Sequence, residues 1–449
     1  MKNGRHIAEF YGVGVMLAIV GGYLDAYTYI SRDHVFANAQ TVKVGLEKYF
    51  KNSPSISISD SLIKISIGNG EKNAIGLGKS YVVKPISKSY YSIDKYYKTY
   101  NLAEKQLFHY TGNSCIPVLT DKGWTIYITT DSKISKNGMT KVTTGANAVV
   151  LSVNGYNKFI VDGNASARVS TNNDVVNLTK AKYRGEIAMY VNNATITPIN
   201  FLDMEQYLYS VVPSEMPGSW PVEALKAQSV AARTYTTNAL GKHGVYDLCD
   251  TVHCQSYNGI NNEYPNSTTA VQGTLGKRLY SNNKLIDAVY FSSDGGATLS
   301  SEDVWNNALP YLVGKKDNYE KDCKKWERIF TYTDLTNIAS KKGYGIGTVT
   351  DLVAGYNENG IVTSLTFKGN LGTKTVTKEE IRSAFNVSAD GSLSSRNFTV
   401  TKGTDSVTLT GKGYGHSCGM SQYGAKAMAE AGKNYIDILK FYYTGVEVK

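Results

Sequence analysis

The chain has 449 residues, enough for two or three domains, and its 42% hydrophobic and 11% aromatic content excludes overall disorder. Its formal charge of +10 and its 34 tyrosines suit anionic polymers and glycans, to which tyrosine offers a flat apolar face and a hydroxyl. Nucleic acid would fit the charge equally well, but no nucleic-acid motif or dense Arg/Lys tract is present, so we expect no nucleic-acid partner. Five cysteines are too few for a disulfide framework in a chain this long.

Residues 1–40 are predicted to be an export signal or a membrane-proximal leader. A basic start precedes an uncharged run from Phe10 to Leu24, and Ala37-x-Ala39 provides a small-residue cleavage pattern. The run is too short to predict a membrane span, and Asp25 is unusual in a signal peptide. The stretch that begins at Gly21 also resembles the opening of a multi-helix bacterial membrane-protein family, so a foreign origin of this leader is an alternative.

Residues 41–165 are predicted to form a small α+β module. A stripe of apolar and aromatic residues after Ser92 predicts a helix that reaches Ala103. A tyrosine-rich surface would suit glycan binding, and a scaffold without a ligand is an equally good interpretation. Alternating runs predict strands at residues 42–46, 56–58, 62–67 and 124–128.

Residues 166–449 are predicted to form a larger, strand-rich α+β domain with a few packed helices. Its central stretch reads as a strand from Tyr207 to Val212, then Glu215, then a helix that begins near Trp220 with Ser219 as its N-cap. Further strands are expected at 181–199 and 348–408, and a second helix at 421–431.

Glu215 is the candidate catalytic residue because it lies in a turn bounded by aromatic residues and proline. Such shielding from water raises the pKa of a carboxyl and makes it a general acid, whereas a nearby arginine or a helix N-terminus lowers the pKa. Lys226 and Arg233 are seven residues apart and are predicted to share a cationic helix face beside Glu215. Gln228 is either a substrate-positioning residue or a packed helix residue.

Two histidines and two cysteines fall within twelve residues after the predicted helix. Imidazoles and thiolates form the tetrahedral donor set that Zn²⁺ prefers, and a site with four protein ligands is structural. The alternatives are a Cys249–Cys254 disulfide and two unpaired buried thiols. The predicted zinc ligands are His243, Cys249, His253 and Cys254.

The segment from Gly415 to Gly419 reads as G-x-S-x-G between a strand and a helix, the context of a nucleophile elbow. That mechanism needs a general-base histidine later in the chain, and none follows His416. We therefore expect its glycines to turn the backbone tightly, either beside a substrate groove that Tyr414, His416 and Gln422 face or as a purely structural turn. If the site has a second catalytic acid, the candidates are Asp294, Glu302 and Asp303.

Several blocks resemble the stage II sporulation protein D and amidase-enhancer family of bacterial cell-wall proteins. The resemblance covers roughly residues 180–449, with Asp294 and Ser417-Cys418 departing from the usual pattern. The blocks, in chain order, are YLYSVVPSEMPGSWPVEALKAQSVAARTY, CQSYNG, FSSDGGATLSSEDVW followed by PYL, and GKGYGHSCGMSQYGAKAMA.

The resemblance implies an extracytoplasmic protein, secreted or membrane-anchored, that acts on peptidoglycan glycan strands. It implies a lytic transglycosylase, in which Glu215 is the single general acid and base and the cut leaves a 1,6-anhydro end. Some members of that family carry zinc at the histidine-cysteine segment. The resemblance equally allows a non-catalytic wall-binding protein that stimulates a partner amidase or other wall hydrolase, and it allows a role in sporulation.

Overall fold

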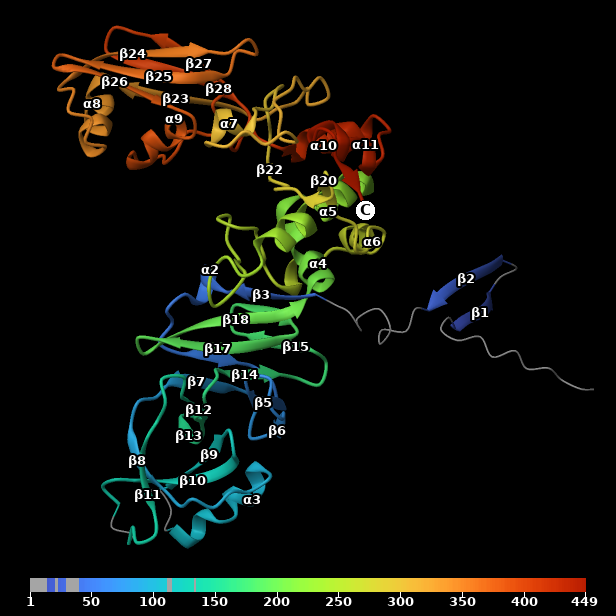
Figure 1. Cartoon of the computed structure of the whole chain (residues 1–449), viewed down its shortest axis with the longest axis vertical. Coiled ribbons are helices and arrows are strands. Elements are labelled where there is room, and N and C mark those ends of the chain that lie inside the picture. The colour runs from blue at the N-terminus through green and yellow to red at the C-terminus, as the bar shows by residue number, and fades with distance from the viewer. Residues whose placement is uncertain (1–13, 21–22, 30–39, 111–114, 133–134) are drawn as a thin grey trace, which may run out of the picture.

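The computed structural model describes residues 14–20, 23–29, 40–110, 115–132 and 135–449. It confirms a mixed α+β fold, with sheets at one end of the molecule, helices in the middle and a second strand-rich region at the other end (Figure 1). In the described part of residues 1–40, β1 (Gly14–Val20) and β2 (Tyr23–Tyr29) form an antiparallel pair. The predicted cleavage pattern at Ala37-x-Ala39 lies outside the described residues.

A seven-stranded sheet supports the helical middle of the molecule. Its strands alternate buried and exposed residues, as expected for a sheet with one face against the core. In spatial order they are β19 (Leu248–Cys249), β3 (Thr41–Gly45), β18 (Thr195–Asp203), β17 (Glu186–Asn192), β14 (Ala167–Ser170), β5 (Ile63–Ile67) and β6 (Asn73–Ile75).

A ten-stranded sheet lies below it in Figure 1 and shares its hydrophobic core. In spatial order its strands are β11 (Thr140–Thr143), β8 (Ser89–Ser92), β10 (Gly123–Thr129), β9 (Cys115–Thr120), β13 (Tyr156–Val161), β12 (Val149–Val153), β7 (Tyr81–Pro85), β4 (Ile56–Ile58), β15 (Val175–Leu178) and β16 (Ala181–Arg184).

The predicted domain boundary near residue 165 falls inside these two sheets. β3 pairs with β18, β5 pairs with β14, and β4 pairs with β15. Strands from both sides of the boundary therefore complete the same sheets, so residues 41–203 fold together. The sequence did not reveal these strand pairs, because pairing over long sequence separations leaves no signal in composition or local periodicity.

The helix predicted after Ser92 is much shorter than expected. Ser92 ends β8, and only α3 (Tyr100–Glu104) is helical, with Thr99 as its N-cap. Tyr97 instead forms an isolated bridge to Trp124 of β10. Aromatic residues fit a pleated surface well, and here cross-strand packing overrides the helical spacing. Two further short helices are α2 (Glu47–Phe50) and the 3-10 helix η1 (Leu107–Tyr110).

The strand predicted over residues 207–212 is wrong, because this segment belongs to α4 (Met204–Glu215). Asp203 caps the helix by accepting hydrogen bonds from the backbone N–H groups of Glu205 and Gln206. The buried apolar residues recur at spacings of three and four, which is the signature of a helix face. They are Met204, Tyr207, Leu208, Val211 and Val212.

The long central helix is α5 (Val222–Ala239), which begins two residues later than predicted. Its N-cap is Pro221, which makes no side-chain capping bond, so the predicted cap at Ser219 is also wrong. Most of α5 is buried, since helices contact it on several sides. Its neighbours are α4, α6 (Pro265–Gln272), α10 (Gln422–Glu430) and α11 (Tyr435–Tyr442).

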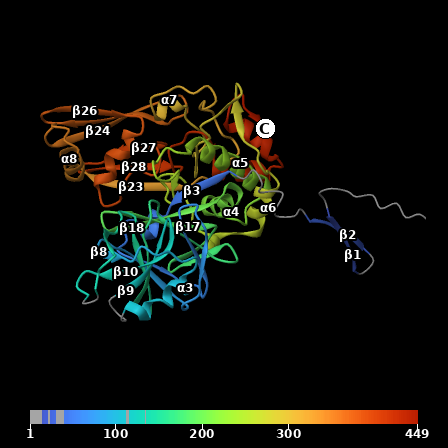
Figure 2. The same cartoon turned by 60° about the horizontal axis from the view of Figure 1, so that its bottom comes forward.

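Residues 325–412 have a hydrophobic core of their own. The two views place their outer strands at the edge of the molecule, away from the N-terminal sheets (Figures 1 and 2). One sheet contains β23 (Lys325–Thr331), β28 (Ser406–Lys412) and β27 (Phe398–Lys402), and another contains β24 (Val349–Tyr356), β25 (Val362–Gly369) and β26 (Gly372–Thr377). The helices are α8 (Tyr332–Lys341), α9 (Glu380–Ser383) and the 3-10 helix η4 (Ala384–Val387).

Short elements connect this region to the helical middle. They are the 3-10 helix η3 (Ile260–Asn262), β20 (Leu279–Ser281), β21 (Lys284–Leu285), β22 (Tyr290–Phe291), α7 (Ser301–Val304), β29 (Met420–Ser421) and β30 (Glu447–Val448).

Among the described residues, no helix has both the length and the apolar character that a membrane crossing requires.

Candidate functional site

Glu215 is the last residue of α4, and two distant segments contact its carboxylate. The backbone N–H of Ser256 donates to Glu215 Oε1 at 2.7 Å, and the side-chain amide of Gln422 donates to Oε2 at 3.3 Å. Gln422 is the first residue of α10, whose N-cap is Ser421. The structure thus brings together two of the predicted site residues, Glu215 and Gln422.

The loop that carries Ser256 is fixed to the last turns of α4. Ser210 Oγ donates to the carbonyl of Gly259 at 2.8 Å. Ser214 Oγ accepts from the side-chain amides of Asn258 and Asn262 at 3.0 and 2.9 Å. These contacts hold the CQSYNG loop against the end of α4. In this position the backbone N–H of Ser256 can donate to Glu215.

A buried polar network lies beside this site. Gln255 Nε2 donates to Tyr207 Oη at 3.2 Å and to Thr236 Oγ1 at 2.7 Å. Tyr290 Oη donates to Gln255 Oε1 at 2.8 Å. The network satisfies the Gln255 amide and fixes the residue immediately before Ser256, which limits the freedom of the Ser256 N–H.

Burial raises the pKa of Glu215 above its ordinary value, while the hydrogen bonds from Ser256 and Gln422 lower it in part. In the part of the chain that the structure describes, no cationic side chain is among the groups that lower the pKa of Glu215. Tyr207, Tyr235 and Tyr290 lie near enough to interact electrostatically with Glu215, and burial raises the pKa of each. The three tyrosines are therefore neutral at physiological pH, and Glu215 is the titrating group of the site.

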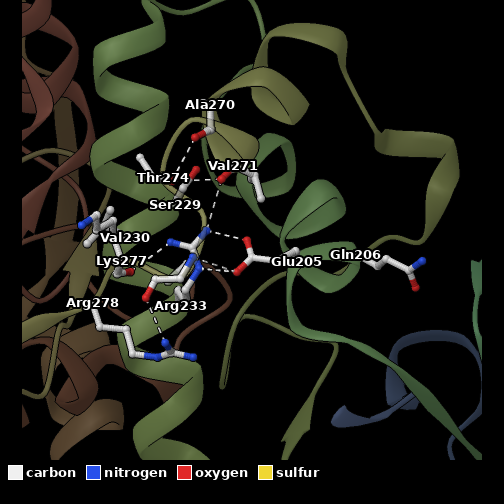
Figure 3. Close-up of polar contacts among 12 residues, drawn as sticks. Glu205, Gln206, Ser229, Val230, Arg233, Ala270, Val271, Thr274, Lys277 and Arg278 are labelled. Carbon is white, nitrogen blue, oxygen red and sulfur yellow. Dashed lines mark hydrogen bonds and ion pairs between the residues drawn. The ribbon is translucent and has the colours of Figure 1, made fainter. Parts of the chain in front are cut away.

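The cationic helix face predicted beside Glu215 is wrong. Arg233 is fully buried and donates to both carboxylate oxygens of Glu205, at 2.7 and 2.6 Å, as Figure 3 shows. It also donates to the carbonyl of Lys277 at 3.0 Å. Lys226 pairs with Glu223 at 2.7 Å. Neither cation forms a hydrogen bond or ion pair with Glu215 within the described ranges.

Gln228 is also placed in the interior. It is fully buried in α5, and both polar atoms of its amide lack a hydrogen-bond partner among the described residues. Of the two interpretations of this residue, the packed helix residue is the one that fits its position. Arg233 joins α5 to Glu205 of α4, Lys226 pairs within α5, and no hydrogen bond or ion pair of Lys226, Gln228 or Arg233 reaches the Glu215 carboxylate among the described residues.

Aromatic rings and a lysine lie around Tyr423, the residue that follows Gln422 in α10. Trp220 and Tyr423 lie edge to face, with ring centroids 4.9 Å apart. Lys324 Nζ lies 5.1 Å from the Tyr414 ring centroid and 5.4 Å from that of Tyr423. Tyr414 is 52% exposed, so its ring is available to a ligand. Flat rings beside ammonium groups form a surface suited to sugars that carry negative charges.

His416 does not face this surface as an acid or base. Its Nδ1 accepts from the backbone N–H of Cys418 at 3.2 Å, so its Nε2 carries the proton and donates to the carbonyl of Tyr290 at 3.1 Å. Burial lowers the pKa of His416 to about 4, so the ring is neutral. Ser417 is buried with a φ of 66°. The segment is therefore a structural turn, and the nucleophile-elbow interpretation fails.

Three of the four predicted zinc ligands, His243, His253 and Cys254, each place one donor atom within 4.8 Å of the others. Cys254 Sγ lies 3.1 Å from His243 Nε2 and 3.4 Å from His253 Nδ1, and Cys249 Sγ lies 3.8 Å from the same nitrogen of His253. Ligands around a tetrahedral zinc ion, with bonds of about 2.2 Å, lie about 3.6 Å apart. Cys249 and Cys254 form no disulfide. His243, His253 and Cys254 thus have the donor types and the spacing of zinc ligands, whereas Cys249 lies next to His253 but outside this mutually close group.

The sequence interpretation did not include Ser256 or Gln255 in the site. Ser256 contributes through its backbone, so its side-chain chemistry gives no signal. The available signal was the CQSYNG block itself, which ends the histidine-cysteine segment. Among the acids considered for a second catalytic role, Asp294 is fully buried, whereas Glu302 and Asp303 are exposed in α7.

Comparison with known proteins finds a family match over the region that contains Glu215 and the histidine-cysteine segment. Residues 192–280 match a family model described as Stage II sporulation protein, and residues 297–419 match a Domain of unknown function (DUF8618). The first match includes Glu215, Ser256 and the histidine-cysteine cluster. The second contains the whole of residues 325–412, the region with a hydrophobic core of its own.

Relatives match over a longer range. The chain is 37% identical to the amidase enhancer of Bacillus subtilis, over 53% of this chain and 39% of that protein. It is 32% identical to stage II sporulation protein D of Bacillus subtilis, over 55% of this chain and 74% of that protein. It is 34% identical to an uncharacterized protein of Brachyspira hyodysenteriae, over 61% of this chain and 74% of that protein. The chain thus spans less than half of the amidase enhancer and about three quarters of the other two.

Proposed function

Because this chain belongs to the stage II sporulation protein D family, we propose that it acts outside the cytoplasm on the peptidoglycan of the cell wall. We propose further that it is a lytic transglycosylase that cleaves the bond between MurNAc and GlcNAc. The observation that carries this proposal is Glu215, a largely buried carboxyl with a raised pKa, which Ser256 and Gln422 hold in one orientation.

In the proposed reaction Glu215 acts first as an acid and then as a base. Its proton passes to the glycosidic oxygen as the bond between that oxygen and the anomeric carbon breaks. The C6 hydroxyl of the same MurNAc bonds to the anomeric carbon, and its proton passes to the Glu215 carboxylate. The products are a free GlcNAc hydroxyl and a 1,6-anhydro ring, and no water is consumed. General acid–base catalysis of this kind contributes about 10²–10⁴-fold in rate.

A single carboxyl is consistent with this chemistry. Hydrolytic glycosidases use two carboxyl groups about 5–10 Å apart across the bond. Within the described residues, the groups that hydrogen-bond to Glu215 are Ser256 and Gln422, neither of which is an acid. Intramolecular attack by a sugar hydroxyl removes the need for a second carboxylate to activate water. The raised pKa favours the protonated form from which the reaction starts.

The aromatic and cationic surface around Tyr423 supports a glycan substrate. Tyr414, Trp220 and Tyr423 provide flat apolar faces, and Lys324 and Lys426 provide positive charge beside them. Sugars pack their axial C–H groups on such rings, and peptidoglycan carries carboxylates on its lactyl and peptide substituents. The overall charge of +10 acts in the same direction.

We also propose that His243, Cys249, His253 and Cys254 hold a structural zinc ion. Four protein ligands leave no open position for substrate, so the ion would take no part in bond cleavage. Its effect would be mechanical, because Cys254 precedes Ser256 by two residues. The ion would fix the loop that carries Ser256, whose backbone N–H donates to Glu215.

The alternative function is non-catalytic stimulation of a wall amidase, which the similarity to the amidase enhancer favours. Purified wall sacculi incubated with this protein alone separate the two. A lytic transglycosylase releases muropeptides with 1,6-anhydro ends, 18 mass units below their hydrolytic counterparts. An enhancer releases nothing alone and increases peptide release when an amidase is added. The absence of anhydro products with intact wall binding would favour the enhancer.

A further inference from the structure

Three carboxylates meet in the interior between β22 and β23, outside the site described above. Asp294 follows β22, and Asp317 and Glu320 lie in the loop before β23. All three are buried, and one oxygen from each lies within 4.8 Å of the others. Three negative charges at this separation repel one another strongly in a medium of low dielectric constant.

The groups that contact these carboxylates are neutral. Glu320 accepts hydrogen bonds from the Ser293 and Ser421 hydroxyls, the latter at 2.8 Å. Asp317 accepts from the Tyr442 hydroxyl at 2.5 Å. No lysine, arginine or histidine in the described part of the chain forms an ion pair with any of the three acids. Hydrogen bonds from hydroxyls stabilise the Asp317 and Glu320 carboxylates but leave the total negative charge of the three acids uncompensated.

An independent observation concerns the second oxygen of Asp294. Asp294 Oδ1 accepts from the backbone N–H of Gly296 at 2.5 Å, while Oδ2 is buried and has no hydrogen-bond partner among the described residues. The one group available to it is the Asp317 carboxyl, and a hydrogen bond between two acids requires a proton on one of them. A buried carboxylate oxygen without a hydrogen-bond donor is rare in folded proteins and calls for an explanation, such as a bound ion.

We propose that Asp294, Asp317 and Glu320 bind a divalent cation of the oxygen-preferring class, with Ca²⁺ as the representative ion. Carboxylates are the ligands of Ca²⁺, Mg²⁺ and Mn²⁺, whereas the softer donors of the histidine-cysteine cluster select zinc. Calcium–oxygen distances of about 2.3–2.6 Å place ligand oxygens up to about 5 Å apart across the ion, and one oxygen from each of the three acids lies within 4.8 Å of the others. The cation would supply the missing partner of Asp294 Oδ2.

The surroundings of the cluster provide access and a structural consequence. Glu320 lines a pocket of 490 Å³ between residues 318–322 and α10. Gly424 of α10 has no side chain, and a Cβ there would lie 2.5 Å from Asp317 Oδ2, so the cluster packs directly against this helix. Ser421, which donates to Glu320, is the N-cap of α10 and precedes Gln422. A bound cation would therefore fix the start of α10. This inference does not depend on whether Glu215 is catalytic.

A proton is the competing occupant. Burial, followed by the negative charges of Glu320 and Asp317, raises the pKa of Asp294 to about 10 in the absence of a cation. A protonated Asp294 would satisfy the cluster at neutral pH without any metal. The two occupants differ in one measurable respect, since only the cation makes the stability of the protein depend on Ca²⁺.

The test is equilibrium dialysis of the full chain against Ca²⁺, together with thermal unfolding at increasing Ca²⁺. The expected result is one Ca²⁺ per chain and a saturable rise in Tm. Asp294→Asn, which keeps the shape and removes one charge, should lose both. Glu302→Gln, which changes an exposed acid of α7, should retain both. Cys249→Ser should also retain them, because its site prefers a different class of metal.

Two results would overturn the proposal. One is the absence of bound Ca²⁺ and of any Tm change in the wild-type chain, also when Mg²⁺ or Mn²⁺ replaces Ca²⁺, which would assign the cluster to a proton. The other is Ca²⁺ binding that Asp294→Asn leaves unchanged, which would place the ion elsewhere. If Asp294→Asn does not fold, Glu320→Gln provides the same comparison, and dialysis of the wild type decides the first result alone.

Discussion

The side-chain amide of Gln422 donates to Glu215 Oε2 at 3.3 Å, across 207 positions of sequence. This contact joins the end of α4 to the start of α10. The carboxyl group is thus enclosed by one backbone donor from the CQSYNG loop and one side-chain donor from the C-terminal helix pair. The candidate site is complete only when both parts of the chain are folded.

Replacement of Gln422 by alanine should slow the proposed cleavage. Hydrogen bonds to a charged group contribute about 1.5–3 kcal/mol, so the rate should fall by about tenfold or more. The loss of a donor also raises the pKa of Glu215 further. The rate is measured as the appearance of 1,6-anhydro muropeptides. Gln206→Ala, a glutamine of α4 that points away from the neighbouring ion pair in Figure 3, is the control and should leave the rate unchanged. Equal rates for Gln422→Ala and wild type would remove Gln422 from the site.

The proposed cleavage should depend on pH through Glu215. A raised pKa means that the protonated acid persists above pH 4.5, the ordinary pKa value of the side chain, and the rate should fall as pH rises through the shifted value. The neighbouring titratable groups are Tyr207, Tyr235 and Tyr290, whose own pKa values are raised and whose ionisation lies at higher pH. A rate profile over pH 4–9 measures this. A rate that increases through this whole range would contradict the role of Glu215 as the initial acid.

The same shift predicts a stability difference. Ionisation of a carboxyl whose folded pKa is raised costs folding free energy once the pH exceeds its unfolded pKa. Glu215→Gln cannot ionise, so it should be more stable than wild type at pH 7 and equal to it at pH 3. Chemical denaturation at the two pH values measures the difference. A Glu215→Gln variant that is less stable than wild type at pH 7 would contradict this prediction, because it would show that the folded state stabilises the ionised form of Glu215.

The Glu205–Arg233 pair should be essential for stability and irrelevant to chemistry. Removing one partner of a buried ion pair leaves an uncompensated charge and costs about 3–5 kcal/mol, so Glu205→Gln should lower the unfolding free energy by that amount. Glu223→Gln removes the partly exposed partner of Lys226 and should cost less than about 1 kcal/mol. Both are measured by denaturant unfolding. A folded Glu205→Gln protein with normal stability but no activity would show that Arg233 acts on substrate.

Removal of zinc should loosen the loop beside Glu215. Cys249→Ser should lose the bound zinc that metal analysis detects in the wild type, and it should expose the backbone around residues 243–258 to faster hydrogen exchange. Cys323→Ser lies outside the cluster and serves as the control. Wild-type protein that contains no zinc after purification without chelators would refute the metal proposal.

Much of this structure is encoded in local patterns. The proximity of His243, His253 and Cys254 was predictable because they lie within twelve residues, so a short loop can bring them together. α10 and its cap at Ser421 follow the capping and spacing rules closely. α4 had a helical spacing of buried residues and a capping Asp203, but the apolar run of valines and tyrosines from Tyr207 to Val212 favoured a strand. Burial against α5 and α6 decides the outcome there.

Other features depend on partners that are distant in sequence. Arg233 is buried because Glu205, 28 residues earlier, supplies its counter-charge, and helical spacing alone does not reveal such a partner. Ser256 contributes a backbone N–H, which residue type does not report. Asp294 meets Asp317 and Glu320 only through the path of the loop before β23. In each case a tertiary contact decides the role of the residue.

The most direct test of the central claim compares wild type with Glu215→Gln on purified sacculi, with products analysed by mass spectrometry. The account predicts 1,6-anhydro muropeptides from the wild type, at least about 10²-fold fewer from Glu215→Gln, and equal sedimentation of both proteins with the wall. Anhydro products released at the same rate by the Glu215→Gln variant would contradict it.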